Sequence, residues 1–428
     1  MANNIPISIY ASRQSPRLTY VANWLSEAWQ AKVQVVTDLA EAGTAMLCYG
    51  ITKPGTISVP DSGLLWETGI RQVQPETGSW QELTTLFPGD GDIPFDLFSA
   101  IFYLLSRYEE HRSFSPDAHG RYPATESILF RAGILRKPIL DLWLEKLRHL
   151  LKLPPTDYQQ QLTYDIDRAF YIKHWPASRQ WSRCLKALLK GKYSEVKNIR
   201  AIAGGKARDP LDAFDFLEEL HQQLAQEPIF FILAAQQGSG FDVNLPPENP
   251  AMQQLIQRLS RTGRLGVHPS YYSMEQPQLI AEEKNILEKT SGKSIFYSRQ
   301  HFMRLRLPQT YSKLMAAGIT DDFSMGYGSH LGFRTGTGRP FFWYDLREEQ
   351  QKKLRVHPFA FMDTTAHFYE KLEASVAFSV LKEMEQDLKN CGSKLITVFH
   401  NYSLGSDAAW KGWRQEYARW TMQSQRGK

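Results

Sequence analysis

The sequence contains little cysteine and no long apolar run, and each shortage excludes a class of protein. Its three cysteines, Cys48, Cys184 and Cys391, lie far apart and form no Cys-x-x-Cys pair. Such a set supports neither a disulfide framework nor a cysteine zinc site, so a reducing compartment is expected. The longest apolar stretch, residues 95–105, is interrupted by polar residues, and residues 1–20 lack the features of an export signal. We therefore expect a soluble, cytoplasmic protein without an integral membrane segment.

A large excess of one charge is also absent. The chain has 50 Lys and Arg residues against 45 Asp and Glu residues, a formal net charge of +5. The most basic neighbourhood contains Arg183, Lys186, Lys190, Lys192, Lys197 and Arg200. A solvated helix face explains this cluster more simply than a nucleic-acid groove, so no nucleic-acid partner is expected.

The composition is otherwise that of a globular protein with room for two domains. Hydrophobic residues make up 42% and charged residues 22% of the 428 residues, which excludes a disordered or fibrous chain. The hydrophobic pattern of the N-terminal residues predicts alternating strands and helices, with strands at 7–10, 33–36 and 45–49 and a helix at 18–30. These elements predict a small α/β unit.

Two adjacent prolines mark the boundary of this unit. Pro154 and Pro155 disfavour helix in the residue that precedes each of them. We therefore predict an N-terminal α/β domain over residues 1–155, without a motif that assigns it a role, and a second domain over 156–428. The charged end of the first domain's apolar helix is interpreted as salt-linked rather than as a second active site; it contains Arg107, Glu109, Glu110 and His111.

The sequence pattern of the second domain predicts a regular alternation of strands and helices. Strands are expected at 161–165, 228–235, 264–268, 294–298, 341–345, 356–362 and 394–400, with helices between them, including a basic helical stretch at 181–202. Strands separated by helices form a parallel sheet or barrel, here with about seven βα units. The fold class is therefore α/β, with a distorted (β/α)7-type barrel after the smaller N-terminal domain.

Polar residues that end these strands are the candidates for chemistry, because the carboxyl ends of parallel strands meet on one face. Asp165 and Asp167 end the first strand two residues apart, so their repelling carboxylates point to the same side. A divalent metal would relieve this repulsion. One carboxylate would bind the metal and the other would accept a proton from the attacking water, whereas two solvated carboxylates are the alternative interpretation.

Three histidines and an arginine follow other strands of the same domain. His268 ends the strand at 264–268, where a neutral imidazole suits zinc or a similar ion. His301 and His400 lie at or just beyond two further strand ends, and a structural histidine is the alternative at each position. Arg299 offers a permanently charged fork that can orient a carboxylate. Their joint placement favours one shared site.

The order of these elements resembles the polysaccharide deacetylase (NodB-like) family of carbohydrate esterases, including a bacterial subgroup with an extra N-terminal α/β domain. The motifs that carry the resemblance are TYDID (163–167), GVHPSYYS (266–273), SRQH (298–301) with AAGI (316–319), TDDFSMGY (320–327) and TVFHNYS (397–403). The resemblance implies that Asp165 is the catalytic base and that Asp167 and His268 bind the metal. It further implies that Arg299 orients Asp165 and that His400 donates a proton to the leaving group.

The sequence departs from the family where a second histidine is expected four residues after His268, because Tyr272 stands there. We predict that His301 replaces this ligand, with His330, His357 or a water molecule as alternatives. Substrate contacts are expected from Tyr271 and Tyr272, whose rings can stack on sugars, and from Arg334, in the loop at 332–341 that is expected to line the substrate cleft. The resemblance of TDDFSMGY to the family's acidic segment adds Asp322 to these contacts.

These inferences converge on a hydrolase that uses a divalent metal, expected to be zinc. Its substrate is predicted to be an N- or O-acetyl group on a glycan or glycan precursor, such as a cell-wall or surface glycan. Two alternatives remain. One is a catalytically impaired glycan-binding or scaffold protein, and the other is a metal-dependent amidohydrolase that acts on a non-sugar amide.

Overall fold

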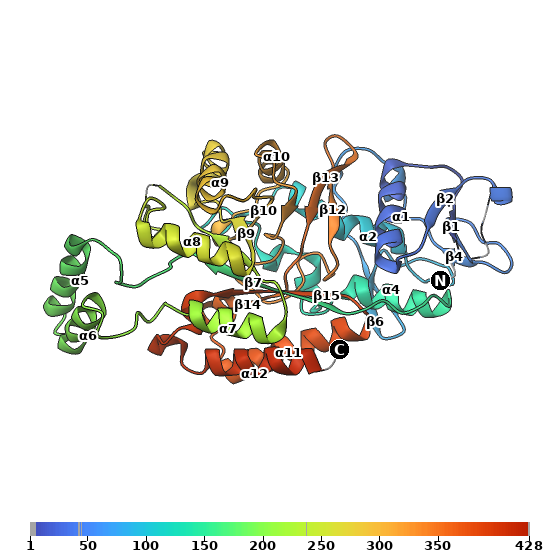
Figure 1. Cartoon of the computed structure of the whole chain (residues 1–428). Coiled ribbons are helices and arrows are strands. Elements are labelled where there is room, and N and C mark those ends of the chain that lie inside the picture. The colour runs from blue at the N-terminus through green and yellow to red at the C-terminus, as the bar shows by residue number, and fades with distance from the viewer. Residues whose placement is uncertain (1–5, 42, 44, 237, 427–428) are drawn as a thin grey trace.

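The computed structural model describes residues 6–426 except 42, 44 and 237. Figure 1 shows an elongated molecule with the N-terminal sheet at one end, a larger sheet in the middle and a pair of helices at the other end. No helix in the described part of the chain is long and apolar enough to cross a membrane.

The N-terminal sheet has four parallel strands in the order β2-β1-β3-β4. Its elements are β1 (Ile7–Tyr10), α1 (Pro16–Trp29), β2 (Val33–Val36), β3 (Ala45–Tyr49) and β4 (Ile57–Val59). The Ser15 side chain caps α1 by accepting a hydrogen bond from the Leu18 amide, and Pro16 occupies the first turn. The three strands and the helix predicted from the sequence are confirmed.

Further elements connect this sheet to the next one. They are the antiparallel hairpin of β5 (Thr77–Trp80) and β6 (Leu83–Leu86), and the helices α2 (Leu97–Leu105), α3 (Ile128–Arg131) and α4 (Ile139–Leu150). Every residue of α2 is buried. This helix was predicted from its apolar sequence.

The central sheet has nine strands in the order β12-β13-β11-β10-β9-β8-β7-β15-β14. All neighbours are parallel except β12, which pairs antiparallel with β13. The strands are β7 (Gln159–Ile166), β8 (Ile229–Ile232), β9 (Arg264–Val267), β10 (Tyr297–Ser298), β11 (Asp321–Asp322), β12 (Phe341–Asp345), β13 (Gln350–Val356), β14 (Phe361–Met362) and β15 (Lys394–His400). Six of the seven predicted strands are confirmed. Residues 356–362 are instead the end of β13, a connecting segment and the short β14, and β11 and most of β13 were not predicted. Within the described residues β12 and β14 do not pair to close a barrel.

Helices follow six of these strands along the chain, whereas β11, β12, β13 and β14 succeed one another without an α-helix between them. The helices include α7 (Phe214–Leu224), α8 (Pro250–Thr262), α9 (Gln278–Ser291), α10 (Gln309–Ala316), α11 (Ala374–Asn390) and α12 (Trp413–Arg426). The single basic helix predicted over 181–202 is instead two helices, α5 (Ala177–Leu189) and α6 (Tyr193–Ala203). Gly191 lies between them with a φ of 68°, a left-handed conformation that ends α5 and reverses the chain.

One apolar core joins the two halves of the chain. It runs from Ile7 and Leu18 in the N-terminal part to Trp343 and Leu354 in the central sheet. Helix α1 lies against the β12–β13 edge of that sheet, where the Tyr20 hydroxyl donates a 2.8 Å hydrogen bond to the Phe342 carbonyl. The N-terminal part therefore covers one edge of the sheet that carries the candidate site.

Candidate metal centre

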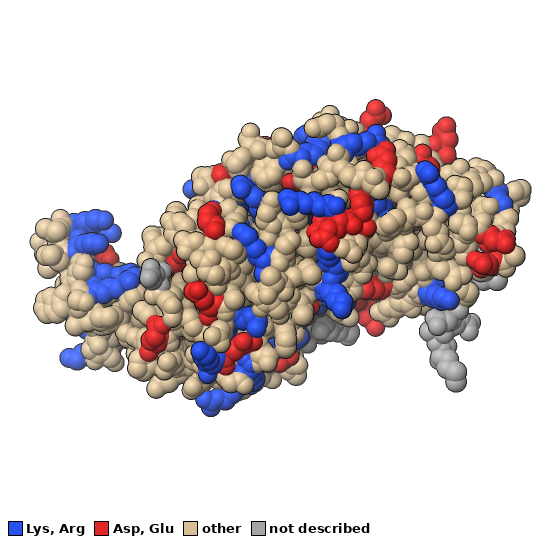
Figure 2. Space-filling model, turned by 90° about the horizontal axis from the view of Figure 1, so that it is seen from above, with Lys and Arg blue, Asp and Glu red and all other residues tan. Residues whose placement is uncertain are grey.

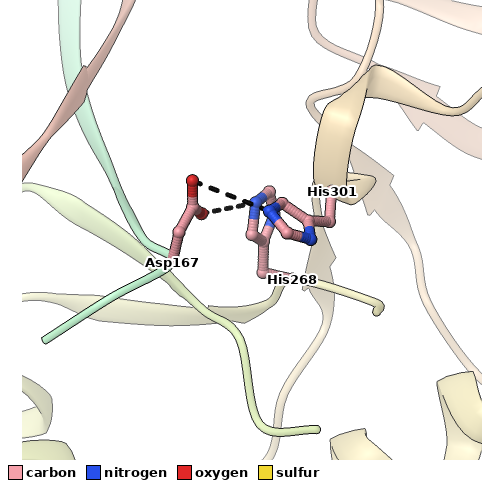
Figure 3. Close-up of side chains that lie close together, drawn as sticks. All are labelled: Asp167, His268 and His301. Carbon is pink, nitrogen blue, oxygen red and sulfur yellow. Dashed lines mark ion pairs between the residues drawn. The ribbon is translucent and has the colours of Figure 1, made fainter. Parts of the chain in front are cut away.

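Three potential metal ligands meet at the carboxyl ends of β7, β9 and β10. Asp167 directly follows β7, His268 directly follows β9 and His301 lies three residues after β10. One ligand atom from each of them lies within 4.8 Å of the others. The His268 Nε2 atom is 3.0 Å from Asp167 Oδ1, and His301 Nε2 is 3.7 Å from Asp167 Oδ2 (Figure 3). The structure thus brings together the three residues that the sequence analysis selected as ligands.

Each imidazole is oriented by a hydrogen bond at its other nitrogen. His268 Nδ1 donates to the Arg299 carbonyl at 2.5 Å, and His301 Nδ1 contacts Asp242 Oδ1 at 2.9 Å. With Nδ1 engaged in this way, Nε2 points toward Asp167 and can bind a metal ion once it carries no proton, which is the arrangement that metal-binding histidines use. The sequence analysis missed Asp242, which lies ten residues beyond β8 in a loop and so had no strand-end signal.

The buried polar atoms of this cluster fit a cation. Asp167 Oδ1 is a buried oxygen without an assigned hydrogen bond, and it lies 3.0 Å from His268 Nε2. Two imidazole nitrogens and one carboxylate oxygen are a donor set that zinc accepts. Burial raises the pKa of Asp167, but His301 and His400 outweigh burial and hold this pKa well below its usual range. The carboxylate is therefore in its ligating, ionised form.

His301 carries a proton that a metal ion would replace. Burial lowers the pKa of His301, but the charges of Asp167 and Asp242 outweigh this effect and raise the pKa to about 9. Only the neutral imidazole is a ligand, so metal binding would release this proton. The same two carboxylates that hold the proton would thus favour a cation in its place.

The alternative ligands do not reach the cluster. His357 Nε2 contacts Asp321 at 2.7 Å and its ring stacks on Phe323, while His330 contacts Ser329. Neither histidine lines the cavity around Asp167. Among the three histidines considered as the additional ligand, His301 is therefore the one in position.

Asp165 lies beside the cluster and is held by Arg299. The Arg299 Nη1 atom donates a 2.7 Å hydrogen bond to Asp165 Oδ1, and both residues are fully buried. The guanidinium is itself fixed, because Nε donates to the Phe323 carbonyl at 3.0 Å. Asp165 Oδ2 has no hydrogen-bond partner and lies 3.9 Å from His268 Nε2. One carboxylate oxygen is thus anchored and the other is free.

His400 ends β15 on the opposite side of Asp167. Its Nε2 is 3.3 Å from Asp167 Oδ2, and its Nδ1 is 2.6 Å from Asp363 Oδ1. Burial lowers the pKa of His400, but Asp363 and Asp167 outweigh burial and raise this pKa well above its usual value. The imidazole is therefore set up as a proton donor. Asp363 was missed, although it directly follows a predicted strand and the same strand-end argument would have selected it.

A cavity of about 210 Å³ opens onto these side chains. Its walls come from several loops and include Arg121, Asp165, Asp167, His268, His301, Phe302, Met362, Phe368, Tyr369, His400 and Tyr402. Arg121 comes from the N-terminal part of the chain and donates a 2.7 Å hydrogen bond to the Phe302 carbonyl. No sequence pattern indicated Arg121, which lies outside the predicted second domain.

None of the four predicted substrate contacts lines this cavity. Arg334 is buried and donates hydrogen bonds of 2.8 and 2.6 Å to Glu110. Asp322 is buried, accepts a 3.0 Å hydrogen bond from Ser298 and has its pKa raised to about 6 by burial. Tyr271 packs face to face on another aromatic ring, and the half-exposed Tyr272 lines a neighbouring hollow. The spacing of residues along the chain does not reveal the paths of these loops, and the side chains they carry do not reach the cavity.

Asp242 provides a direct test of the cluster. We expect Asp242→Asn to weaken zinc affinity about tenfold, because loss of this charge makes His301 a poorer ligand. Competition with a chromophoric chelator would measure the change. Asp321→Asn is the matched control, since Asp321 also pairs with a histidine, His357, but outside the cavity. Equal affinities in the two variants would contradict the assignment of His301.

Comparisons with known proteins found matches to parts of the chain. A family model described as "Family of unknown function (DUF7033)" matches residues 7–154. No curated protein matches the chain.

Three solved structures are similar to part of the chain. A putative polysaccharide deacetylase from Mycobacterium smegmatis is 9% identical, with a TM-score of 0.41, over 64% of this chain and 85% of that one. A probable polysaccharide deacetylase from Pseudomonas aeruginosa PAO1 is 12% identical, with a TM-score of 0.41, over 65% and 91%. A CE4 family pseudoenzyme from Bacillus anthracis is 7% identical, with a TM-score of 0.31, over 64% and 62%. Each of these structural matches therefore covers about two thirds of this chain.

Proposed function

We propose that this protein is a metal-dependent hydrolase that removes an N- or O-linked acetyl group from a glycan or glycan precursor. The observation that carries the proposal is the set of three groups around one cavity. They are an Asp-His-His cluster, a carboxylate anchored by a buried arginine, and an imidazole anchored by a buried carboxylate. This set matches the roles that the sequence resemblance implies for Asp165, Asp167, His268, Arg299 and His400.

Asp167, His268 and His301 would hold the metal. A divalent ion such as zinc supplies positive charge that polarises an acetyl carbonyl and makes water more acidic. The hydrogen bonds from His268 to the Arg299 carbonyl and from His301 to Asp242 would fix the orientation of both imidazoles toward the metal.

Asp165 would act as the general base. Its free Oδ2 oxygen accepts the proton of the water that attacks the acetyl carbon, while Arg299 holds the other oxygen. The buried ion pair also fixes the direction of the free oxygen.

His400 would act as the general acid. Its Nε2 hydrogen passes to the leaving nitrogen or oxygen of the sugar as the bond to the acetyl carbon breaks, and Asp363 holds the resulting imidazole. The net reaction adds one water molecule and releases acetate and a free amine or hydroxyl group. Phe368 and Tyr369 line the cavity, are about half exposed and offer ring faces to a sugar.

We also propose that the chain is organised as an N-terminal domain over residues 1–155 and a second domain over 156–428. In this arrangement the N-terminal domain shapes the cavity through Arg121, which would lie beside a bound glycan.

The test is acetate release by the purified chain before and after metal removal. We expect the protein to release acetate from N-acetylated chitooligosaccharides or O-acetylated xylo-oligosaccharides, to lose activity with a chelator and to regain it with zinc. Glycan binding without metal or acetate release would contradict the proposal and favour the scaffold alternative. Activity only on non-sugar amides in the same assay would favour the amidohydrolase alternative.

A further inference from the structure

The helices α5 and α6 form a hairpin with an unusual surface. Their contact is already filled by a small core of Cys184, Ala187, Val196, Ile199 and Ile202, together with Ile172. Beyond that core, the four most exposed large apolar side chains of the described residues all belong to this hairpin. They are Leu189 (80% exposed), Tyr193 (73%), Trp181 (66%) and Leu185 (58%).

Four exposed apolar residues form a stripe along α5. Trp181, Leu185, Leu188 and Leu189 follow the spacing i, i+4, i+7 and i+8, which places them on one face of α5. The exposed Tyr193 is the first residue of α6, just beyond the turn that follows α5. A stripe of this size in water indicates a surface that is covered by a partner.

The same hairpin carries a strong excess of positive charge. Residues 177–203 contain seven Lys and Arg residues and one acidic residue, a net charge of +6, while the whole chain carries +5. The single acidic residue, Glu195, lies 3.7 Å from Lys192. Figure 2 shows blue side chains gathered on the lobe at the left, which is the end where α5 and α6 lie in Figure 1. The apolar stripe is therefore accompanied by unneutralised basic residues.

The hairpin is also placed to meet a flat surface. It projects from the body of the molecule on two connecting segments (Figure 1). The first segment, residues 168–176, leaves β7 at the sheet edge that carries Asp167. The tip between α5 and α6 combines the apolar Leu189 and Tyr193 with the basic Lys190 and Lys192.

We propose that the α5–α6 hairpin is a docking site for an anionic membrane surface. The apolar stripe would enter the boundary between headgroups and acyl chains, and the surrounding Lys and Arg side chains would contact anionic headgroups. Nucleic acid would account for the charge but leaves the apolar stripe unexplained. A second copy of the chain would cover the stripe, but it would bring two hairpins of +6 charge together.

The test is co-sedimentation of the full chain with phosphatidylcholine vesicles that either contain or lack phosphatidylglycerol. We expect binding only to the anionic vesicles and weaker binding as salt increases. The triple variant Lys186→Gln, Lys190→Gln, Lys192→Gln should lose about 100-fold in affinity, because each lysine near such a surface contributes roughly a factor of five. The triple variant Trp181→Ser, Leu185→Ser, Leu189→Ser should lose binding as well.

A matched control replaces three apolar residues elsewhere on the surface, Leu150→Ser, Phe296→Ser and Val376→Ser, each 49% exposed in the native chain. This control should bind the anionic vesicles as the native chain does. Equal loss in the control, or equal binding to neutral vesicles, would overturn the proposal. Duplex DNA binding that survives the Trp181 triple variant would indicate nucleic acid instead, and a dimer in light scattering that this variant abolishes would indicate a second copy.

Discussion

Asp165→Asn is expected to lower kcat for acetate release by about 10² to 10⁴-fold while metal content remains unchanged. The amide keeps the size of the side chain and a hydrogen-bond acceptor, but it cannot take a proton from water. Asp165 lies beside the Asp-His-His cluster without being one of its three members, so the metal should be retained. Acetate assays and elemental analysis on the same preparation would measure both quantities. Full activity in this variant would remove Asp165 from the mechanism.

Arg299→Lys serves as a companion to this variant because it tests positioning rather than proton transfer. The fork of Arg299 fixes Asp165 Oδ1 and the Phe323 carbonyl together, and a lysine cannot reproduce that geometry. With Asp165 misaligned, kcat for acetate release should fall about 100-fold while KM and metal content stay unchanged. Acetate assays and elemental analysis on one preparation would measure these quantities. An unchanged kcat would show that Arg299 has no influence on the base.

Glu110→Gln is expected to lower the free energy of unfolding by about 3 to 5 kcal/mol, because it breaks a buried ion-pair network. Glu110 accepts hydrogen bonds from Arg107 at 2.7 Å and from Arg334 at 2.8 and 2.6 Å, and all three side chains are almost fully buried. The substitution would leave two guanidinium groups without their shared counter-charge. Urea unfolding would measure the loss. Glu416→Gln, in the exposed pair with Arg419, is the control and should change stability by less than about 1 kcal/mol.

The difference in unfolding free energy between the native chain and Glu110→Gln should depend on pH, because it follows the pKa of Glu110. Burial raises this pKa, but Arg334 and Arg107 outweigh burial and lower it from 4.5 to about 2. The folded state therefore keeps Glu110 ionised at a pH where the unfolded chain binds a proton. The gap in stability between the native chain and Glu110→Gln should be constant above about pH 5 and shrink as pH falls from 4.5 toward 2. A gap that is the same at both ends of this interval would refute the role given to the network.

The network also shows where the sequence analysis was right and where it was wrong. The cluster at the end of the apolar helix was interpreted as salt-linked, and the pairs of Arg107 with Glu109 and Glu110 confirm this. Arg334 was assigned to substrate, yet it is the second partner of Glu110. The two residues lie more than two hundred positions apart, so no local pattern connects them. Only the packing of the two halves of the chain places them together.

The sequence by itself determined the parts of this protein that depend on local order. Hydrophobic periodicity predicted the strands and helices, and the strand ends selected Asp165, Asp167, His268, Arg299, His301 and His400. These six residues lie close together because parallel neighbours all end at one edge of a sheet, whatever their order in the sheet. Tertiary structure alone decided which loop residues complete the site. Asp242 and Arg121 come from loops whose paths depend on packing against distant segments, and the same packing turns Asp322 and Arg334 away. Spacing along a chain carries no information about such paths.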